Sequence, residues 1–170
     1  MESIEVGLSL GSNTGKRLAS LVEAKKLILN IRGVSLTDQS SVYETEAKDV
    51  RAEFKALNFL NTILIIQTSI SIRNLLRIFF SIERELGRKP SFLRNAPRVI
   101  DIDIIYAGQM QINEEELIIP HPQWARRRFV LCPLCEVRPN LHIPGQSGTV
   151  SDVLSHLKDE TMVRLYASKW

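Results

Sequence analysis

Hydrophobic positions alternate with polar or small ones along the first part of the chain. Apolar residues stand at every second position from Ile4 to Leu10. This period of two is typical of a strand that buries one face. A small and polar segment, 11–15, ends the strand, and apolar residues then recur at helical spacing from Leu18 to Ile31. The pattern predicts a strand followed by a helix.

The same patterns predict two more strands, a second helix and a fourth strand. Residues 34–45 are rich in Ser, Thr and Val, and 59–68 show the clearest strand pattern of the chain. Apolar residues follow helical spacing over 72–86, Gly87 then stops the helix, and 99–107 form the last strand. The order βαββαβ predicts an α+β, ferredoxin-like sandwich, in which an antiparallel sheet carries both helices on one face.

Polar residues interrupt three of these strands, and the predicted topology brings them together. Strands 59–68 and 99–107 would flank the first strand in the sheet. The face away from the two helices would then carry these off-pattern residues: Gly7, Ser9, Phe59, Asn61, Asp101 and Asp103. We expect this uncovered face to hold the functional site.

Length and composition agree with one globular domain over 1–170. One core typically holds roughly 100–200 residues, and 44% hydrophobic with 24% charged residues is far from the composition of disordered chains. Residues 117–119 are a candidate fifth strand, and short helices and loops form a C-terminal extension. No apolar run is long enough to span a membrane and the start lacks signal-peptide features, so we expect a cytoplasmic protein.

A net charge of +3 permits an anionic ligand without requiring one. The two cysteines, Cys132 and Cys135, could form a redox pair or half of a zinc site. Their apolar neighbours, and the absence of a second Cys/His pair with zinc-finger spacing, favour two buried core thiols instead.

Asp101 and Asp103 carry the most informative chemistry. Two positions apart in a strand, both carboxylates project from one face, with Cα atoms about 6–7 Å apart. Two like charges this close need a cation, and carboxylate oxygens suit Mg²⁺. The alternative is a solvated pair on an exposed strand, although Asp is depleted in strands.

Basic residues surround this acidic pair along the sequence. They are Arg88, Lys89, Arg94 and Arg98 before it, and His121 with Arg126, Arg127 and Arg128 after it. Arginine binds phosphate oxygens bidentately, so the combination favours a site for a metal-bound nucleoside triphosphate over a solvated basic surface. Glu83 falls within the apolar face of its helix, where we expect it to pair with an arginine of the following loop. The segment 11–17 lacks the spacing of a P-loop.

Five segments together resemble the 6-hydroxymethyl-7,8-dihydropterin pyrophosphokinase family of folate biosynthesis. They are Leu10-Gly11-Ser12-Asn13, Phe59-Leu60-Asn61, Arg98-x-x-Asp101-x-Asp103, Pro120-His121 and Phe129-Val130-Leu131-x-Pro133-Leu134. The resemblance runs over about 4–157. It implies a ferredoxin-like fold and transfer of the β,γ-pyrophosphoryl group of ATP to the hydroxymethyl oxygen of the pterin, with AMP as the second product.

The resemblance also implies residue roles. Asp101 and Asp103 would hold two Mg²⁺ ions, and Arg88 and Arg98 would act with them in catalysis. The co-substrate ATP would be bound by Glu83, Arg88, Arg94, Arg98, Ile104, His121 and Arg127. The pterin would be bound by Thr45, Phe59, Asn61, Asp101 and Phe129, with the two aromatic rings sandwiching it.

Some positions depart from the family pattern. A charged loop over 46–55 follows Tyr43-Glu44-Thr45, and Pro90 and Asn95 stand where an arginine and an aromatic are common. We therefore expect an active enzyme with altered pterin affinity. Two alternatives are an RNA-binding module that uses 126–129 and a degenerate family member that acts as a scaffold. No nucleic acid, membrane or obligate protein partner is expected.

Overall fold

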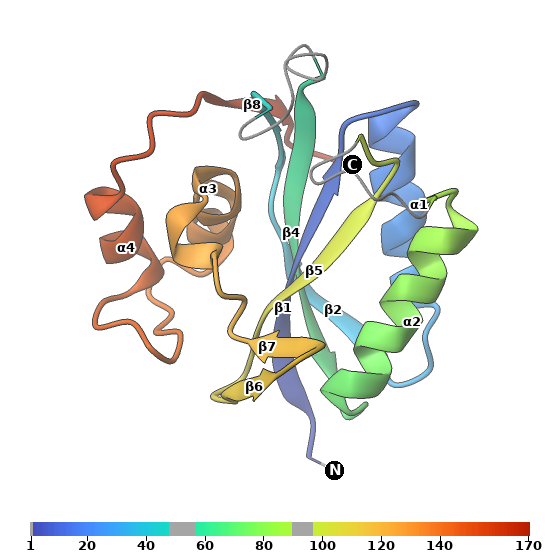
Figure 1. Cartoon of the computed structure of the whole chain (residues 1–170), viewed down its shortest axis with the longest axis horizontal. Coiled ribbons are helices and arrows are strands. Elements are labelled where there is room, and N and C mark those ends of the chain that lie inside the picture. Colours follow the sequence, from blue (N-terminus) through green and yellow to red (C-terminus); the bar gives the residue numbers. More distant parts are fainter. Residues whose placement is uncertain (1, 48–56, 90–96) are drawn as a thin grey trace.

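A central antiparallel sheet organises the residues that the computed structural model describes, which are 2–47, 57–89 and 97–170. Its strands are β1 (Ile4–Ser12), β2 (Val34–Gln39), β3 (Val42–Thr45), β4 (Phe59–Thr68), β5 (Asp101–Ala107) and β8 (Val163–Ala167). The helices are α1 (Arg17–Leu29), α2 (Ile72–Glu85), α3 (Arg128–Val137) and α4 (Val150–His156), with a short 3-10 helix at Trp124–Arg126. Helices lie on both sides of the sheet (Figure 1).

The strand order is β5-β1-β4-β3-β8, and β2 pairs with the other half of β4. The prediction that β4 and β5 flank β1 is confirmed. The predicted single strand over 34–45 is wrong, because it breaks at Ser40 and Ser41. The Ser40 hydroxyl accepts the Ile63 amide hydrogen at 2.9 Å, replacing a bond that a continuous ladder would make.

Helices α1 and α2 cover one face of the sheet, as predicted. Val6, Leu8 and Leu10 of β1 are fully buried against apolar side chains of both helices, such as Leu21 and Phe79. These are the alternate positions that the sequence pattern assigns to the buried face. Burial of this apolar surface fixes the register, since a slip by one residue would turn the polar positions inward.

The second face is not uncovered, contrary to the prediction. Ile63 and Ile105 pack there with Val130 and Leu134 of α3 in a second hydrophobic cluster. The ring of Tyr106 fills the space beside Gly7, where an added Cβ would lie 2.2 Å from the ring. The C-terminal extension therefore covers part of this face and leaves the end of the sheet near Asn61 and Asp101 for a site.

Two charged residues fix the C-terminal end of α3 to the sheet. Glu136 accepts hydrogen bonds from the Ser41 amide and hydroxyl and from the Tyr43 hydroxyl, at 2.8–3.1 Å. Arg138 bonds Glu5 of β1 at 2.9 Å and Asp38 of β2 at 3.0 Å. The beginning of α3, which carries Phe129, is thereby held at a set position over the sheet.

The structure also tests the predictions for residues 117–119 and for the two cysteines. Leu117–Ile119 is a strand, β7, but it pairs with β6 (Ile112–Glu114) in a separate two-stranded sheet. Cys132 and Cys135 lie on α3 as free thiols that are only partly buried, so the prediction of two buried thiols is wrong. Within the described residues no helix is long and apolar enough to cross a membrane.

Candidate active site

Two carboxylates stand side by side at the start of β5. Asp101 pairs with Gly11 and Asp103 with Ser9 across the ladder to β1, so both side chains project from the same face. The strand begins at Asp101 and not at 99, where the pattern placed it. The predicted acidic pair is therefore present at the open end of the second face.

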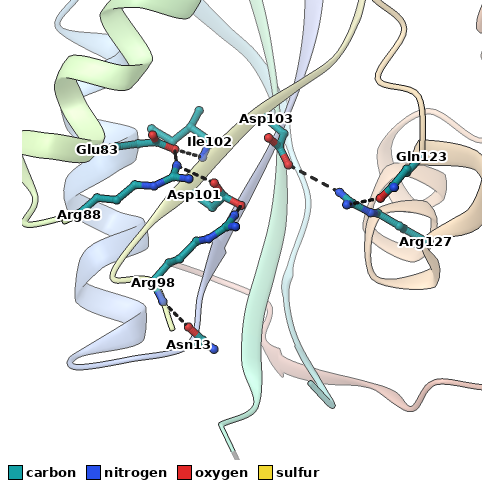
Figure 2. Close-up of polar contacts among 9 residues, drawn as sticks. All are labelled: Asn13, Glu83, Arg88, Arg98, Asp101, Ile102, Asp103, Gln123 and Arg127. Atoms are coloured by element: carbon teal, nitrogen blue, oxygen red, sulfur yellow. Dashed lines mark hydrogen bonds and ion pairs between the residues drawn. The ribbon is translucent and has the colours of Figure 1, made fainter. Parts of the chain in front are cut away.

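Arginine side chains converge on this pair. Arg88 Nη1 lies 2.7 Å from Asp101 Oδ1, and Arg98 Nη1 lies 2.5 Å from Asp101 Oδ2. Arg127 Nη1 approaches Asp103 Oδ2 more loosely, at 3.8 Å, from the opposite side (Figure 2). Asp101 is thus held by two cations at short distance, whereas the ion pair that Asp103 makes with Arg127 is longer.

Glu83 of α2 holds Arg88 and the backbone of β5 from the side of the helix. Its side chain is 3% exposed, accepts the Ile102 amide hydrogen at 2.8 Å and forms an ion pair with Arg88 (Figure 2). The predicted pairing with a loop arginine is confirmed. Burial, partly offset by the Ile102 amide and by Arg88, raises the pKa of Glu83. The carboxyl group ties α2, β5 and Arg88 together.

The electrostatics of Asp103 favour a bound cation. Burial, and next the neighbouring charge of Asp101, raises the pKa of Asp103 to about 7, although Arg127 opposes the shift. Within the described ranges no group of three or more His, Cys, Asp or Glu side chains is placed to hold a metal ion, which leaves Asp101 and Asp103 as a pair of candidate ligands. This donor set fits Mg²⁺, which takes few protein ligands and completes its shell with water and phosphate oxygens.

A pocket of about 380 Å³ opens beside the carboxylates. Its lining is mixed, with arginines and acidic residues, Glu115 and Glu116 among them, beside apolar residues such as Leu76, Phe80 and Ile118. The lining includes these predicted site residues: Glu83, Arg88, Arg98, Asp101, Asp103, Ile104, His121 and Arg127. A pocket of this size that combines charged and apolar lining residues can accept a phosphorylated ligand that carries a flat ring.

His121 is neutral in this pocket. Burial, and next the positive charge of Arg127, lowers the pKa of His121 to about 4. Its Nδ1 accepts a hydrogen bond from the Gln123 amide at 3.1 Å, so the ring proton lies on Nε2. His121 can therefore donate one hydrogen bond to a ligand without carrying a charge.

The predicted pterin residues extend the site along the same face. Gly11 pairs with Asp101 on one side and with Asn61 on the other, which makes a row across three strands. An added Cβ at Gly11 would lie 3.0 Å from Asn61 Oδ1, so a larger residue at position 11 would crowd this amide oxygen. Asn61 Nδ2 donates to Thr45 Oγ1 at 2.7 Å, and both residues are buried.

The two predicted aromatic residues are both partly buried. Phe59 lies on the same face as Asn61, two positions earlier in β4. Phe129 is the second residue of α3, and the Arg127 guanidinium lies over its ring, 5.5 Å from the centroid. Arg94 lies outside the described residues, as do 48–55, Pro90 and Asn95.

A family model described as 7,8-dihydro-6-hydroxymethylpterin-pyrophosphokinase (HPPK) matches residues 7–139. The chain belongs to this family. A Bacillus subtilis relative, 2-amino-4-hydroxy-6-hydroxymethyldihydropteridine pyrophosphokinase, is 41% identical over 76% of this chain and 75% of its own length. A relative of the same name from Methylorubrum extorquens is 35% identical and covers 93% of this chain and 96% of its own.

Longer HPPK relatives carry additional sequence. A folate synthesis bifunctional protein from Arabidopsis thaliana is 38% identical over 78% of this chain, which spans 27% of that protein. A crystal structure of Plasmodium falciparum HPPK-DHPS superposes with a TM-score of 0.70 over 91% of this chain and 42% of the other. At 14% identity this second likeness shows the fold alone.

Sequence reasoning found the charged residues around Asp101 and Asp103 in the HPPK pocket but missed other residues in and near it. It assigned no role to the apolar side chains of Leu76, Phe80 and Ile118, because apolar residues at helix or strand spacing normally indicate core. Gln123, which contacts Arg127, and Asn13, which contacts the backbone of Arg98, were also missed. Asn13 stood within a quoted motif, but its contact joins segments 85 residues apart.

Proposed function

We propose that this chain transfers the β,γ-pyrophosphoryl group of ATP to the hydroxymethyl oxygen of 6-hydroxymethyl-7,8-dihydropterin, giving the pterin pyrophosphate and AMP. One observation carries the proposal. The carboxylates of Asp101 and Asp103 lie between an arginine-lined pocket and a buried amide, Asn61, on one sheet face. Membership of the HPPK family and the names of its relatives support the same reaction.

The arginine residues of the pocket would bind the triphosphate. Arg88, Arg98 and Arg127 line it, and each presents a guanidinium group that can bond two phosphate oxygens. Arg94, from the loop before Arg98, would join them. These side chains would hold the chain of phosphates in line with the acceptor hydroxyl and stabilise the charge that develops during transfer.

Asp101 and Asp103 would hold Mg²⁺, and we propose two ions as the family resemblance implies. Bound Mg²⁺ neutralises phosphate charge and orients the reacting oxygens. The protein's own contribution is to keep both carboxylates on one rigid strand. Arg88 and Arg98 fix the orientation of Asp101 through its two oxygens.

The remaining pocket residues would bind the nucleoside. The neutral imidazole of His121 can donate from Nε2 to a phosphate or ribose oxygen. Leu76, Phe80 and Ile104 offer apolar surface that a base can cover. Glu83 also lines this pocket, and its contacts with Ile102 and Arg88 give it a supporting part in nucleotide binding.

This assignment predicts that ionisation of His121 does not contribute to the pH dependence of the rate near neutral pH. Because the imidazole stays neutral above a pH of about 5, its ionisation should leave no limb in the pH–rate profile between about pH 5.5 and pH 8. His121→Gln, whose amide can still donate, should keep the shape of the wild-type profile, whereas His121→Ala should raise the KM for ATP. An acidic limb near pH 6.5 that disappears in His121→Gln would contradict a neutral donor.

The pterin would lie between Phe59 and Phe129, with Asn61 and Thr45 at its polar edge. The Asn61 amide is held by Thr45, and its oxygen lies toward Gly11. There it would form hydrogen bonds with the amide edge of a flat ring. Stacking on two rings and a buried polar contact would give affinity and orientation together.

Phe129→Ala should therefore weaken pterin binding selectively. Loss of one stacking surface should raise the KM for the pterin roughly 10-fold, since stacking of a base on an aromatic ring contributes about 1–3 kcal/mol. The KM for ATP should change little. Steady-state kinetics with each substrate varied in turn measures the difference, and Phe129→Tyr, which keeps the ring, is the matched control. An equal rise in both constants would show that Phe129 supports the pocket as a whole.

The finer expectations follow from the same picture. The order β5-β1-β4 with α1 and α2 on one face supports the ferredoxin-like description of the βαββαβ part. The substrates ATP and dihydropterin would be the partners of this site, with no obligate protein partner, and the cytoplasmic location stays a prediction. The longer relatives show that such a domain also occurs within larger proteins.

The RNA-binding alternative gains no support from the arginine run. Arg127 faces Asp103 and Gln123, and Arg128 donates to the Asp159 carbonyl oxygen at 3.0 Å. Arg127 and Arg128 therefore contact different parts of the chain. Turnover of ATP and pterin would exclude the scaffold alternative.

An AMP-release assay tests the proposed reaction. The protein is supplied with ATP, Mg²⁺ and 6-hydroxymethyl-7,8-dihydropterin, and each component is omitted in turn or Mg²⁺ is removed by a chelator. AMP should form only when all three are present. A folded protein that binds an ATP analogue but releases no AMP would contradict the proposal and favour the scaffold alternative.

A further inference from the structure

Asn13 makes an unusual pair of contacts with the residue that precedes the catalytic strand. Its backbone N–H donates to the Arg98 carbonyl oxygen at 3.1 Å, and its Oδ1 accepts the Arg98 amide hydrogen at 2.7 Å. Both backbone polar groups of Arg98 are thereby bound to one residue. Figure 2 shows Asn13 beneath Arg98, whose side chain extends from this fixed point to Asp101.

Arg98 depends on these contacts because it lies outside the sheet. β5 begins only at Asp101, so the ladder to β1 does not hold the backbone of Arg98. The same strand end nevertheless positions both groups. Gly11 of β1 pairs with Asp101, and Asn13, just after β1, holds Arg98. The guanidinium of Arg98 and the carboxylate of Asp101 therefore share one support.

The buried side chain of Asn13 lowers the stability of the folded state. Asn13 is 2% exposed, and its Nδ2 has no hydrogen-bond partner among the residues that the structure describes. A buried donor without a partner destabilises the folded state. Among the described residues the amide side chain of Asn13 uses its Oδ1 acceptor alone, and this oxygen binds the backbone of a predicted phosphate-binding arginine.

We infer that Asn13 is a positioning residue for pyrophosphoryl transfer, an inference that rests on the proposed function. It holds the backbone of Arg98 so that the guanidinium meets the phosphates in the geometry of the transition state. Asn13 acts through Arg98 and does not itself touch the substrate. Its effect should consequently appear in kcat far more than in nucleotide affinity.

Four variants separate this role from a general structural one. Asn13→Ala removes the acceptor, and Asn13→Asp keeps an acceptor oxygen at the same place. Arg98→Ala and the double variant Asn13→Ala/Arg98→Ala complete a cycle. Asn140→Ala, an exposed site far along the sequence, is the matched control for loss of an asparagine. Each protein is assayed for AMP release and for equilibrium binding of a non-hydrolysable ATP analogue with Mg²⁺.

Asn13→Ala should lower kcat about 10- to 100-fold, the loss expected when a reacting group is displaced by about 1 Å, with a change in analogue affinity below about 3-fold. Asn13→Asp should recover most of the rate. In the Arg98→Ala background, Asn13→Ala should have little further effect. Wild-type kcat in Asn13→Ala, or losses that multiply in the double variant, would overturn the positioning role.

Hydrogen exchange of the Arg98 amide gives a readout that needs no activity. Exchange should accelerate in Asn13→Ala and stay slow in Asn13→Asp and in Asn140→Ala. If the wild type releases no AMP, the proposed reaction fails, while the exchange data still decide whether Asn13 holds Arg98. If Asn13→Ala does not fold, Asn13→Ser, whose hydroxyl is too short to reach the Arg98 amide, should show the same loss of kcat and the same faster exchange.

Discussion

Asp103→Asn should abolish pyrophosphoryl transfer while the protein stays folded. The amide cannot supply the negative charge that a Mg²⁺ ligand needs, and loss of several kcal/mol of stabilisation in the transition state corresponds to about 10³-fold or more in kcat. The fold should not suffer, because the substitution removes a carboxylate that faces the like charge of Asp101. AMP release and thermal unfolding measure the two effects separately.

A matched control distinguishes this role from a general need for acidic residues in the sheet. Asp38→Asn removes a carboxylate of β2 away from the pocket and leaves Arg138 bound to Glu5, so that α3 keeps its hold on the sheet. It should keep the wild-type turnover. If Asp103→Asn keeps more than about a tenth of the wild-type kcat, Asp103 does not bind an essential metal ion.

Arg98→Ala should lower kcat by about 100-fold, with a much smaller effect on binding of the ATP analogue. A preorganised donor aimed at developing charge contributes this much in comparable sites, and it acts in the transition state more than in the bound ground state. Arg98→Lys keeps the charge but loses the two-pronged geometry, so its kcat should fall between those of the alanine variant and the wild type. Pre-steady-state AMP formation and equilibrium titration measure the two quantities.

A loss of analogue affinity with kcat unchanged would give Arg98 a different role. The arginine would then bind ATP equally well in the ground state and the transition state, so that its removal lowers ATP affinity without a specific effect on the chemical step. A wild-type rate in Arg98→Ala would remove Arg98 from the site altogether. The ion pair with Asp101 would in that case serve only to orient the carboxylate.

The parts of the fold that the sequence predicted are those whose periodicity reflects burial on one face. Val6, Leu8 and Leu10 alternate with small residues because one side of β1 packs against α1 and α2, and α2 presents Leu75 and Phe79 at helical spacing to the same core. The acidic pair was predictable because Asp is rare at two positions of one strand. Glu83 was predictable as paired because an isolated buried carboxylate is costly.

The other parts depend on contacts between distant segments. α3 contains Pro133 and packs on the second face through Val130 and Leu134, and no local pattern states which face a short helix will cover. The break in the strand at Ser40 arises from a side-chain bond to Ile63. β8 (Val163–Ala167) was not predicted, because pairing with β3 defines it and most of its side chains are exposed.

Phosphorus NMR of the reaction products tests the central claim most directly. The protein is incubated with ATP, Mg²⁺ and 6-hydroxymethyl-7,8-dihydropterin until the substrates are consumed. Transfer of the whole pyrophosphoryl group should give AMP and a pterin that carries two mutually coupled phosphorus atoms, in equal amounts. Formation of ADP with a pterin monophosphate, or hydrolysis of ATP with no phosphorus on the pterin, would contradict it.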